Sequence, residues 1–230
     1  YDHIIHDCAI QHLPVMFCMD RAGIAGEDGP THHGALDIAY MRSIQGMIVS
    51  APKNGNELRR LMYTALSIND HPFSIRYPKT SSIEFEENEQ IELIPVGSWD
   101  IEKKGKDILV LAVGPMVYTA LDALKQNVLT AYNIEIVNCR FIKPMDIAYL
   151  KKIKETFSSI ITIEEGSKVG GFGDGVASWL LENGYKGRFK KIGLPDSFVE
   201  HGSRDQILEM LGLDSKGIAL KLNKFLKEKN

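Results

Sequence analysis

The stretch that decides the fold is the apolar run VMFCM (15–19), with the glycine-rich loop DRAGIAGEDGPTHHG (20–34) directly after it. A short apolar run of this kind suits a strand that is buried on both faces of a parallel sheet. Ligands of open parallel sheets bind at the carboxyl ends of the strands, so the loop lies where chemistry is expected. The loop's glycines permit backbone conformations that are closed to other residues, and its side chains can therefore converge.

Segments with helical and strand patterns alternate along the rest of the chain, beginning with helical spacing in residues 1–12. Helices are expected at 36–43, 54–68, 116–124, 174–184, 208–211 and 218–226, and strands at 47–51, 73–77, 107–113, 134–142, 159–165 and 190–194. Asn54 is a candidate cap at the start of the helix expected at 54–68. Such alternation predicts right-handed crossovers and an α/β fold with mainly parallel sheets.

One interruption of this alternation divides the chain into two tandem domains, 1–79 and 107–230. Residues 80–106 are polar and charged and form the predicted linker, with one strand expected near Leu93 to Val96. The chain begins in mid-pattern at Tyr1, without signal-peptide character, and we expect it to be a piece of a longer polypeptide.

The composition excludes several classes of protein. The chain is 44% hydrophobic and 25% charged, as is usual for globular domains. Its 27 basic and 30 acidic residues give no signature of nucleic-acid binding, and no segment approaches the roughly 18 apolar residues that span a membrane. We therefore expect a cytoplasmic protein without nucleic-acid or membrane partners. Cys8, Cys18 and Cys139 lack the spacing of a disulfide framework or zinc site, and reduced, buried thiols are expected.

The glycine-rich loop carries residue types suited to anion binding and proton transfer. The Arg21 guanidinium suits a planar or phosphate anion. Asp28 and His32 can accept hydrogen bonds or carry protons near neutral pH. The alternative is a solvated loop whose polar side chains only cap local turns. No metal site is expected, because adjacent histidines such as His32 and His33 seldom face one ion.

Several motifs resemble those of one enzyme family. DRAG (20–23), GEDGPTHHG (26–34), RYPK (76–79), RFIKPMD (140–146) and TIEEGSKVGGFGDGV (162–176) are similar to motifs of the 1-deoxy-D-xylulose-5-phosphate synthase family, in the thiamine-diphosphate-dependent transketolase superfamily. The resemblance spans essentially the whole chain. It implies that residues 1–79 are the latter part of a pyrimidine-binding domain and residues 107–230 a transketolase C-terminal domain.

The resemblance also implies a reaction. In this family, pyruvate is decarboxylated on the thiazolium, and the two-carbon carbanion adds to D-glyceraldehyde 3-phosphate, giving a precursor of isoprenoids, thiamine and pyridoxal. The implied cofactors are thiamine diphosphate and Mg²⁺, and the implied assembly is a homodimer. The cofactor-binding residues are expected mainly upstream of Tyr1, so we expect the 230-residue chain alone to be inactive.

The family motifs assign roles to residues of the loop. By resemblance, Arg21 binds the phosphate of the acceptor, and Asp28 and His32 contact donor and acceptor and assist proton transfer. His33 has no such role and is expected to be structural. A second phosphate ligand is expected at Lys79, where the family usually has arginine. Lysine keeps the charge but lacks the bidentate fork, which predicts weaker phosphate binding.

Other conspicuous motifs are expected to be structural. The sequence GDG (173–175) looks like the start of a magnesium-diphosphate motif, but Asn183 follows too soon to complete it. The glycines of 170–175 could cradle a phosphate on free N–H groups, although tight packing or a domain contact is favoured. Interface or capping roles are expected for Glu164 and Glu165, and a structural strand role for Arg76. His201 could lie near the active-site rim or cap the helix that follows, and the cap is favoured.

Two other functions stay open from the sequence. The β-type subunit of a 2-oxoacid dehydrogenase shares the two-domain plan, and a non-catalytic assembly module would only hold a dimer together. The wording of the DRAG and DGPTHHG motifs argues against the first function. Retention of Arg21, Asp28 and His32 argues against the second.

Overall fold

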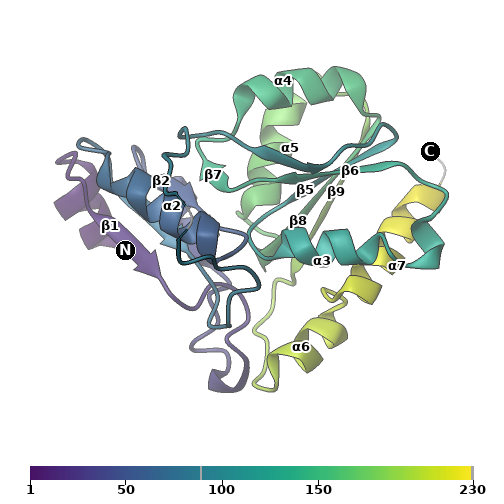
Figure 1. The fold of residues 1–230 in the computed structure, drawn as a ribbon, viewed down its shortest axis with the longest axis horizontal. Helices are drawn as coiled ribbons and strands as arrows, with labels where there is room; N and C mark the ends of the chain where they lie inside the picture. Colours follow the sequence, from purple (N-terminus) through teal and green to yellow (C-terminus); the bar gives the residue numbers. More distant parts are fainter. Residues whose placement is uncertain (89, 229–230) are drawn as a thin grey trace.

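The computed structural model describes residues 1–88 and 90–228, which form two α/β layers side by side (Figure 1). The first layer contains the strands β1 (Met16–Met19), β2 (Ile48–Ser50), β3 (Phe73–Arg76) and β7 (Phe141–Lys143), the helices α1 (Asp37–Ser43) and α2 (Gly55–Leu66), and the short segments η1 (Ile4–Ala9) and η2 (Gly26–Asp28). The π-helical segment η1 lies where the helical spacing of residues 1–12 predicts a helix.

The second layer contains the strands β4 (Asp100–Lys103), β5 (Ile108–Ala112), β6 (Ile134–Asn138), β8 (Ser159–Ser167) and β9 (Arg188–Leu194). Its helical segments are α3 (Met116–Ala123), η3 (Asn127–Leu129), α4 (Ile147–Thr156), α5 (Phe172–Glu182), α6 (Arg204–Leu211) and α7 (Ser215–Lys227). Side-chain caps define several helix starts. At α2, for example, the side chain of Asn54 accepts a hydrogen bond from the backbone N–H of Glu57, as its position before the helix predicts.

Both sheets are mainly parallel. The strand order is β1-β3-β2-β7 in the first sheet and β4-β6-β5-β8-β9 in the second. The pairs β2–β7 and β4–β6 are antiparallel, and the other neighbours run parallel. The α/β fold with mainly parallel sheets is therefore confirmed.

The structure corrects the single strand expected at 134–142. This apolar run contains β6 in the second sheet and β7 in the first, where β7 pairs with β2. Both halves of the run are buried, each in a different sheet, so burial alone could not separate them. The helix α4 was not among the expected elements.

The strand expected near Leu93 to Val96 is also wrong. Ile94 is buried there, but its N–H donates to Thr64 Oγ1 (2.9 Å) on α2 rather than to a strand. The strand of this region is β4, a largely exposed edge strand whose sequence DIEK is too polar to be recognised as an apolar run. The division into 1–79, 80–106 and 107–230 stays a prediction.

A continuous apolar core joins the two layers. Ile38 and Met41 on α1 share one buried cluster with Phe172 and Val176 on α5. Helices α3, α6 and α7 contribute to the core on the other face of the second sheet. Figure 1 shows that the loop after β1 lies next to α6, and this packing places the loop against the second layer.

Candidate functional site

The sheet topology brings together two segments that are far apart in the sequence. The loop 20–34 follows β1 and Lys79 lies shortly after β3, and these two strands are parallel neighbours. Beyond the strands, the N–H of Tyr77 donates to the carbonyl of Met19 (2.9 Å), and the N–H of Ala22 donates to the carbonyl of Tyr77 (3.0 Å). Both segments therefore lie at the carboxyl edge of the sheet, where ligands of parallel sheets bind.

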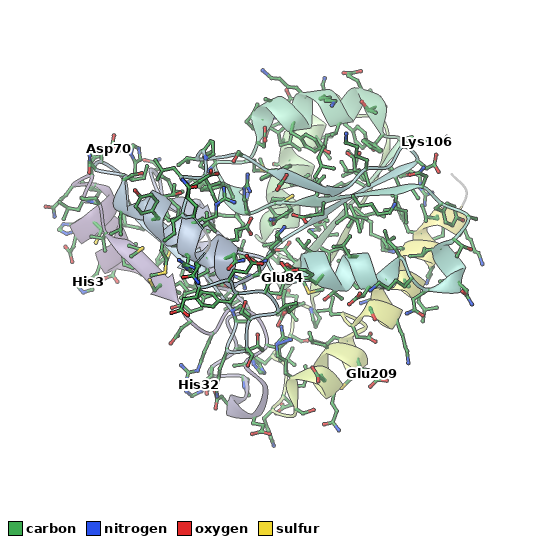
Figure 2. All side chains as sticks on the ribbon, viewed as in Figure 1. His3, His32, Asp70, Glu84, Lys106 and Glu209 are labelled. Carbon is green, nitrogen blue, oxygen red and sulfur yellow. The ribbon has the colours of Figure 1, made fainter. Side chains whose placement is uncertain are left out.

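Glycines determine the shape of the loop. Gly23 and Gly34 exchange backbone hydrogen bonds of 2.9 and 2.8 Å, which close its base. Gly23, Gly26 and Gly29 have φ angles of +75°, +84° and +77°, a region that other residues rarely adopt. The carbonyl of Gly29 accepts hydrogen bonds from the N–H groups of His32 and His33. Figure 2 shows that His32 lies near the far end of this loop.

Four charged side chains meet at the mouth of the loop, because Asp20 Oδ1 lies 3.8 Å from Arg21 Nη1 beside the Arg21–Asp28–Lys79 group. Lys79 Nζ donates to Asp28 Oδ2 (2.8 Å), and Arg21 Nε donates to the same oxygen (3.4 Å). The side chains of Arg21, Asp28 and Lys79 are 42%, 30% and 51% exposed. Lys79, and to a smaller extent Arg21, lowers the pKa of the Asp28 carboxyl, which is therefore ionised at neutral pH.

This cluster is better explained by binding than by stability. Exposed ion pairs contribute little to the free energy of unfolding. Two cations that converge beside solvent are, by contrast, well placed for a phosphate dianion, and charge-assisted hydrogen bonds to such a group are strong. Asp28 holds Arg21 and Lys79 at one point, so the cations are arranged before an anion arrives.

His32 lies on a different part of the same surface. Arg21 and His32 both line a cavity of about 430 Å³, together with Cys18, Asp37 and Tyr40. His32 is exposed, and its Nδ1 lies 2.9 Å from Thr31 Oγ1. Arg21 thus connects the cavity to the charged cluster.

The structure does not bring all four predicted site residues to one point. Within residues 1–88 and 90–228, Asp28 and Lys79 are not among the residues that line this cavity, and no hydrogen bond joins His32 to Asp28. Arg21 belongs to both the charged cluster and the cavity lining, so a substrate that extends from the cluster into the cavity would pass beside Arg21.

His33 is held in the protein framework. The N–H of Ala25 donates to His33 Nδ1 (3.0 Å), and His33 Nε2 lies 3.5 Å from the carbonyl of Glu200 in the second layer. With Nδ1 acting as an acceptor, the proton of the neutral ring lies on Nε2. These contacts tie the His33 ring to the loop and to the second layer, while His33 also lines the cavity, so its purely structural role stays a prediction.

A buried ion pair lies beneath the loop. Arg76 Nε donates to Asp37 Oδ2 (2.6 Å), and both side chains are about 95% buried. Arg76 Nη2 also donates to the carbonyls of Gly34 (3.2 Å) and Glu165 (2.9 Å). The structural role expected for Arg76 is confirmed, because its side chain joins α1, the loop and β8.

The glycines of 170–175 do not form an empty phosphate cradle. The Glu164 carboxylate accepts hydrogen bonds from the N–H groups of Phe172 and Gly173, both at 2.8 Å. Arg42 on α1 donates to the carbonyls of Gly170 and Gly171, both at 2.7 Å. The capping role of Glu164 and the domain contact of the glycine segment are therefore confirmed, and the phosphate cradle is wrong.

Burial raises the pKa of the Glu164 carboxyl. Loss of solvent raises its pKa from 4.5 to about 7, even though the N–H groups of Gly173 and Phe172, and then Arg76 and Arg42, favour the ionised form. The group therefore titrates near neutral pH, close to the contact between the two layers.

The cap expected at His201 is wrong. Ser203 is the N-cap residue of α6, and its side chain accepts a hydrogen bond from the N–H of Gln206. His201 instead packs on the loop, because its Cβ lies 3.2 Å from the position that a Cβ at Gly29 would occupy. No local pattern in the sequence indicates this contact.

The cysteines are free, but only one is buried among the three. Cys139 is buried, Cys8 is half-buried and Cys18 is exposed. The expectation of buried thiols is therefore wrong for Cys18, which lies on β1 at the border of the cavity. Among the residues that the structure describes, no group of three His, Cys, Asp or Glu side chains could hold a metal ion, and no helix has the length and apolar character to cross a membrane.

Comparison with known protein families agrees with this architecture. The model of the transketolase pyrimidine-binding domain matches residues 1–83, and that of the transketolase C-terminal domain matches residues 97–218. The chain belongs to the transketolase family.

Its relatives within that family include curated proteins named 1-deoxy-D-xylulose-5-phosphate synthase. The protein from Aquifex aeolicus is 41% identical over 218 residues, which cover 95% of this chain and 34% of that protein. The protein from Bacteroides fragilis is 43% identical over 219 residues, again 95% of this chain and 34% of the relative. The chain thus spans about a third of the length of these relatives, and the resemblance seen in the motifs is confirmed.

Solved structures show the same fold. A split gene transketolase, described as an inactive beta4 tetramer, superposes with a TM-score of 0.84 at 26% identity, covering all of this chain and 72% of that one. A transketolase mutant from Pichia stipitis has a TM-score of 0.71 at 21% identity over 96% of this chain and 32% of that one, a likeness that shows the fold alone.

Proposed function

We propose that this chain forms the acceptor-binding part of a 1-deoxy-D-xylulose-5-phosphate synthase, which condenses pyruvate with D-glyceraldehyde 3-phosphate and releases CO₂. The observation that carries the proposal is the convergence of Arg21 and Lys79 on Asp28 at the carboxyl edge of the first sheet. Relatives of that name, 41% and 43% identical over 95% of the chain, support it.

In this proposal, the phosphate of the acceptor binds between Arg21 and Lys79. Arg21 offers a planar fork of N–H donors, and Lys79 offers a compact point charge. Asp28 keeps the two cations together in the absence of the phosphate and orients them when the phosphate binds. The aldehyde end of the acceptor then lies in the cavity that Arg21 shares with His32.

We assign the role of proton carrier to His32. An imidazole can donate or accept a proton near neutral pH, and His32 is exposed at the border of the cavity. We place it beside the aldehyde oxygen of the acceptor, which takes up a proton when the new carbon–carbon bond forms. His32 is thus the proposed catalytic residue, Arg21 and Lys79 are the proposed phosphate ligands, and Asp28, which the family motif also assigns to proton transfer, holds the two cations in place.

The proposed enzyme requires thiamine diphosphate and Mg²⁺, and the cofactor supplies stabilisation of the carbanion when bound. Residues 1–88 and 90–228 do not fit a site for the diphosphate and metal, because they contain no cluster of metal-ligating side chains and Glu164 occupies the N-terminus of α5. We propose that residues outside this chain hold these groups, in a cytoplasmic homodimer.

The test is CO₂ release from pyruvate by a polypeptide that contains this chain and the diphosphate-binding domain, with thiamine diphosphate and Mg²⁺ present. Release that depends strongly on D-glyceraldehyde 3-phosphate is the expected result. Release that is indifferent to the aldehyde but responds to a lipoyl acceptor would instead identify a 2-oxoacid dehydrogenase subunit. No release at all would point to an assembly module.

A further inference from the structure

A buried carboxylate of the second layer reaches the base of the loop. Glu165, at the carboxyl-end half of β8, is only 4% exposed. Its Oε1 accepts a hydrogen bond from the backbone N–H of Ile24 (2.6 Å), 141 residues away in the sequence. Its Oε2 accepts a hydrogen bond from Arg204 Nη2 (2.5 Å) at the start of α6. One side chain therefore joins the loop, β8 and α6.

The glycines of the loop are matched to this contact. A Cβ at Gly23 would overlap the Glu165 carboxylate, so only glycine lets the loop approach so closely. Farther along the loop, a Cβ at Gly26 would lie 3.5 Å from the carbonyl of Gly202 and from the backbone nitrogen of Arg204. The segment 200–204 therefore packs against the loop near Gly26, and Glu165 packs against it near Gly23, where the loop begins.

We propose that Glu165, held by Arg204, is a positioning residue that sets the loop 20–34 for binding of the acceptor phosphate. The inference rests on the proposed function of the loop. Glu165 acts through the Ile24 amide, which lies three residues after Arg21 and just beyond the Gly23–Gly34 closure. A small displacement of the backbone at residues 23 and 24 would move Arg21 relative to Lys79. Binding of one anion by two cations is sensitive to the distance between the cations.

The neighbouring glutamate provides a matched control. Glu164 and Glu165 are adjacent on β8 and both are buried. Glu164 accepts hydrogen bonds from the first turn of α5, whereas Glu165 accepts one from the loop. Replacing either carboxylate by glutamine leaves one acceptor oxygen in place of two, but the donor that loses its partner lies in a different segment.

The first experiment measures amide hydrogen exchange in the 230-residue chain. Glu165→Gln should raise exchange at Ile24 and through residues 20–34 about tenfold or more. The single acceptor oxygen of glutamine cannot serve both the Ile24 N–H and the Arg204 guanidinium. Glu164→Gln should instead raise exchange at residues 171–175. Arg204→Lys, which keeps the positive charge beside Glu165, should preserve most of the loop's protection. A loop that stays equally protected in Glu165→Gln overturns the inference.

The second experiment measures kinetics in the polypeptide that also contains the diphosphate-binding domain. Glu165→Gln should raise KM for D-glyceraldehyde 3-phosphate about tenfold, with KM for pyruvate and kcat changed by less than about twofold. Equal changes for both substrates, or the same split in Glu164→Gln, would overturn the positioning role.

The two experiments separate failure of the inference from failure of the proposed function. If the unsubstituted enzyme shows no aldehyde-dependent CO₂ release, the proposed function fails. The exchange measurement then still decides whether Glu165 holds the loop. If the enzyme is active and Glu165→Gln changes neither exchange nor KM, the inference alone fails.

Discussion

Two glycine-rich segments of this molecule, 20–34 and 166–175, both combine glycines with charged residues. The first exposes charged side chains to solvent, whereas the backbone groups of the second are occupied by other parts of the protein. The first segment follows β1, a partly exposed edge strand that is less buried than its apolar sequence predicts, and the second follows the buried strand β8. Each segment contacts a buried glutamate. The first presents Arg21 to solvent and to a cavity. In the second, Glu164 occupies the N–H groups at the start of α5, and Arg42 occupies two carbonyls.

The difference teaches that glycines permit a binding loop without defining one. Glycine gives the backbone access to unusual conformations and close approaches. Whether the exposed groups then meet a ligand depends on what the rest of the fold places against them. In the first segment, the carboxylate of Glu165 lies at the base and leaves the charged side chains free to bind, whereas in the second Glu164 occupies the position that an anion would take.

Removing the guanidinium of the open loop should have the largest effect. Arg21→Ala should raise KM for D-glyceraldehyde 3-phosphate about 30- to 1000-fold, corresponding to the loss of about 2–4 kcal/mol from a charged hydrogen-bonding partner of the phosphate. KM for pyruvate should change much less. Arg59→Ala on α2, whose side chain does not line the cavity, is the control. Equal effects on both substrates would contradict the phosphate-binding role.

Changing the closed segment should affect the pH dependence of stability instead. The pKa of Glu164 is about 7 in the folded chain against an ordinary value of 4.5, so its folded state holds the proton more tightly than its unfolded state. The stability that this group contributes is present below pH 4.5 and is lost as the pH rises to about 7. The loss is on the order of 3 kcal/mol, at about 1.4 kcal/mol per pKa unit.

Urea unfolding of the chain at pH 5 and pH 8 measures this effect. The stability of the unsubstituted chain relative to Glu164→Gln should fall by that amount between the two pH values. Glu209→Gln, at an exposed position of α6 (Figure 2), should show no comparable change. A constant difference between Glu164→Gln and the unsubstituted chain would refute the titration of Glu164 in this range.

Within the open loop, the two adjacent histidines should respond differently. His32→Ala should lower kcat about 100-fold if the imidazole carries a proton in the transition state. His33→Ala should lower kcat far less, but it should reduce the free energy of unfolding by about 1 kcal/mol, because the hydrogen bond from the Ala25 N–H is lost. Equal losses of kcat in both variants would remove the distinction between a catalytic and a structural histidine.

Much of the fold was predictable because the relevant signals are local. Helical and strand periodicity identified most elements, and the rule for carboxyl ends of parallel strands placed the loop at that edge of the sheet. Lys79 was expected there from the family motifs alone. Asn54 was recognised as a cap because the partner of its side chain lies three residues away. The charged cluster itself came from family motifs rather than from periodicity.

The parts that were missed depend on distant partners. The run 134–142 divides between two sheets because β7 finds its neighbour β2 about ninety residues earlier in the chain, and no local period encodes that change. Glu165 could be recognised as a cap or interface residue, but its partners Ile24 and Arg204 lie in remote segments. His201 was assigned to a helix start because only its position in sequence was visible, whereas it contacts the loop at Gly29.

The smallest effect is expected at the second cation of the open loop. Lys79→Arg should lower KM for D-glyceraldehyde 3-phosphate by about two- to fivefold, because a guanidinium forms two parallel hydrogen bonds with a phosphate where an ammonium acts as a point charge. Unphosphorylated D-glyceraldehyde should show no such improvement and is the control substrate. Lys79 already contacts Asp28 at 2.8 Å, so the arginine must keep this contact while it turns toward the phosphate. An unchanged KM for the phosphorylated aldehyde would mean that Lys79 holds Asp28 and does not bind the phosphate, leaving Arg21 as the principal anion ligand of the loop.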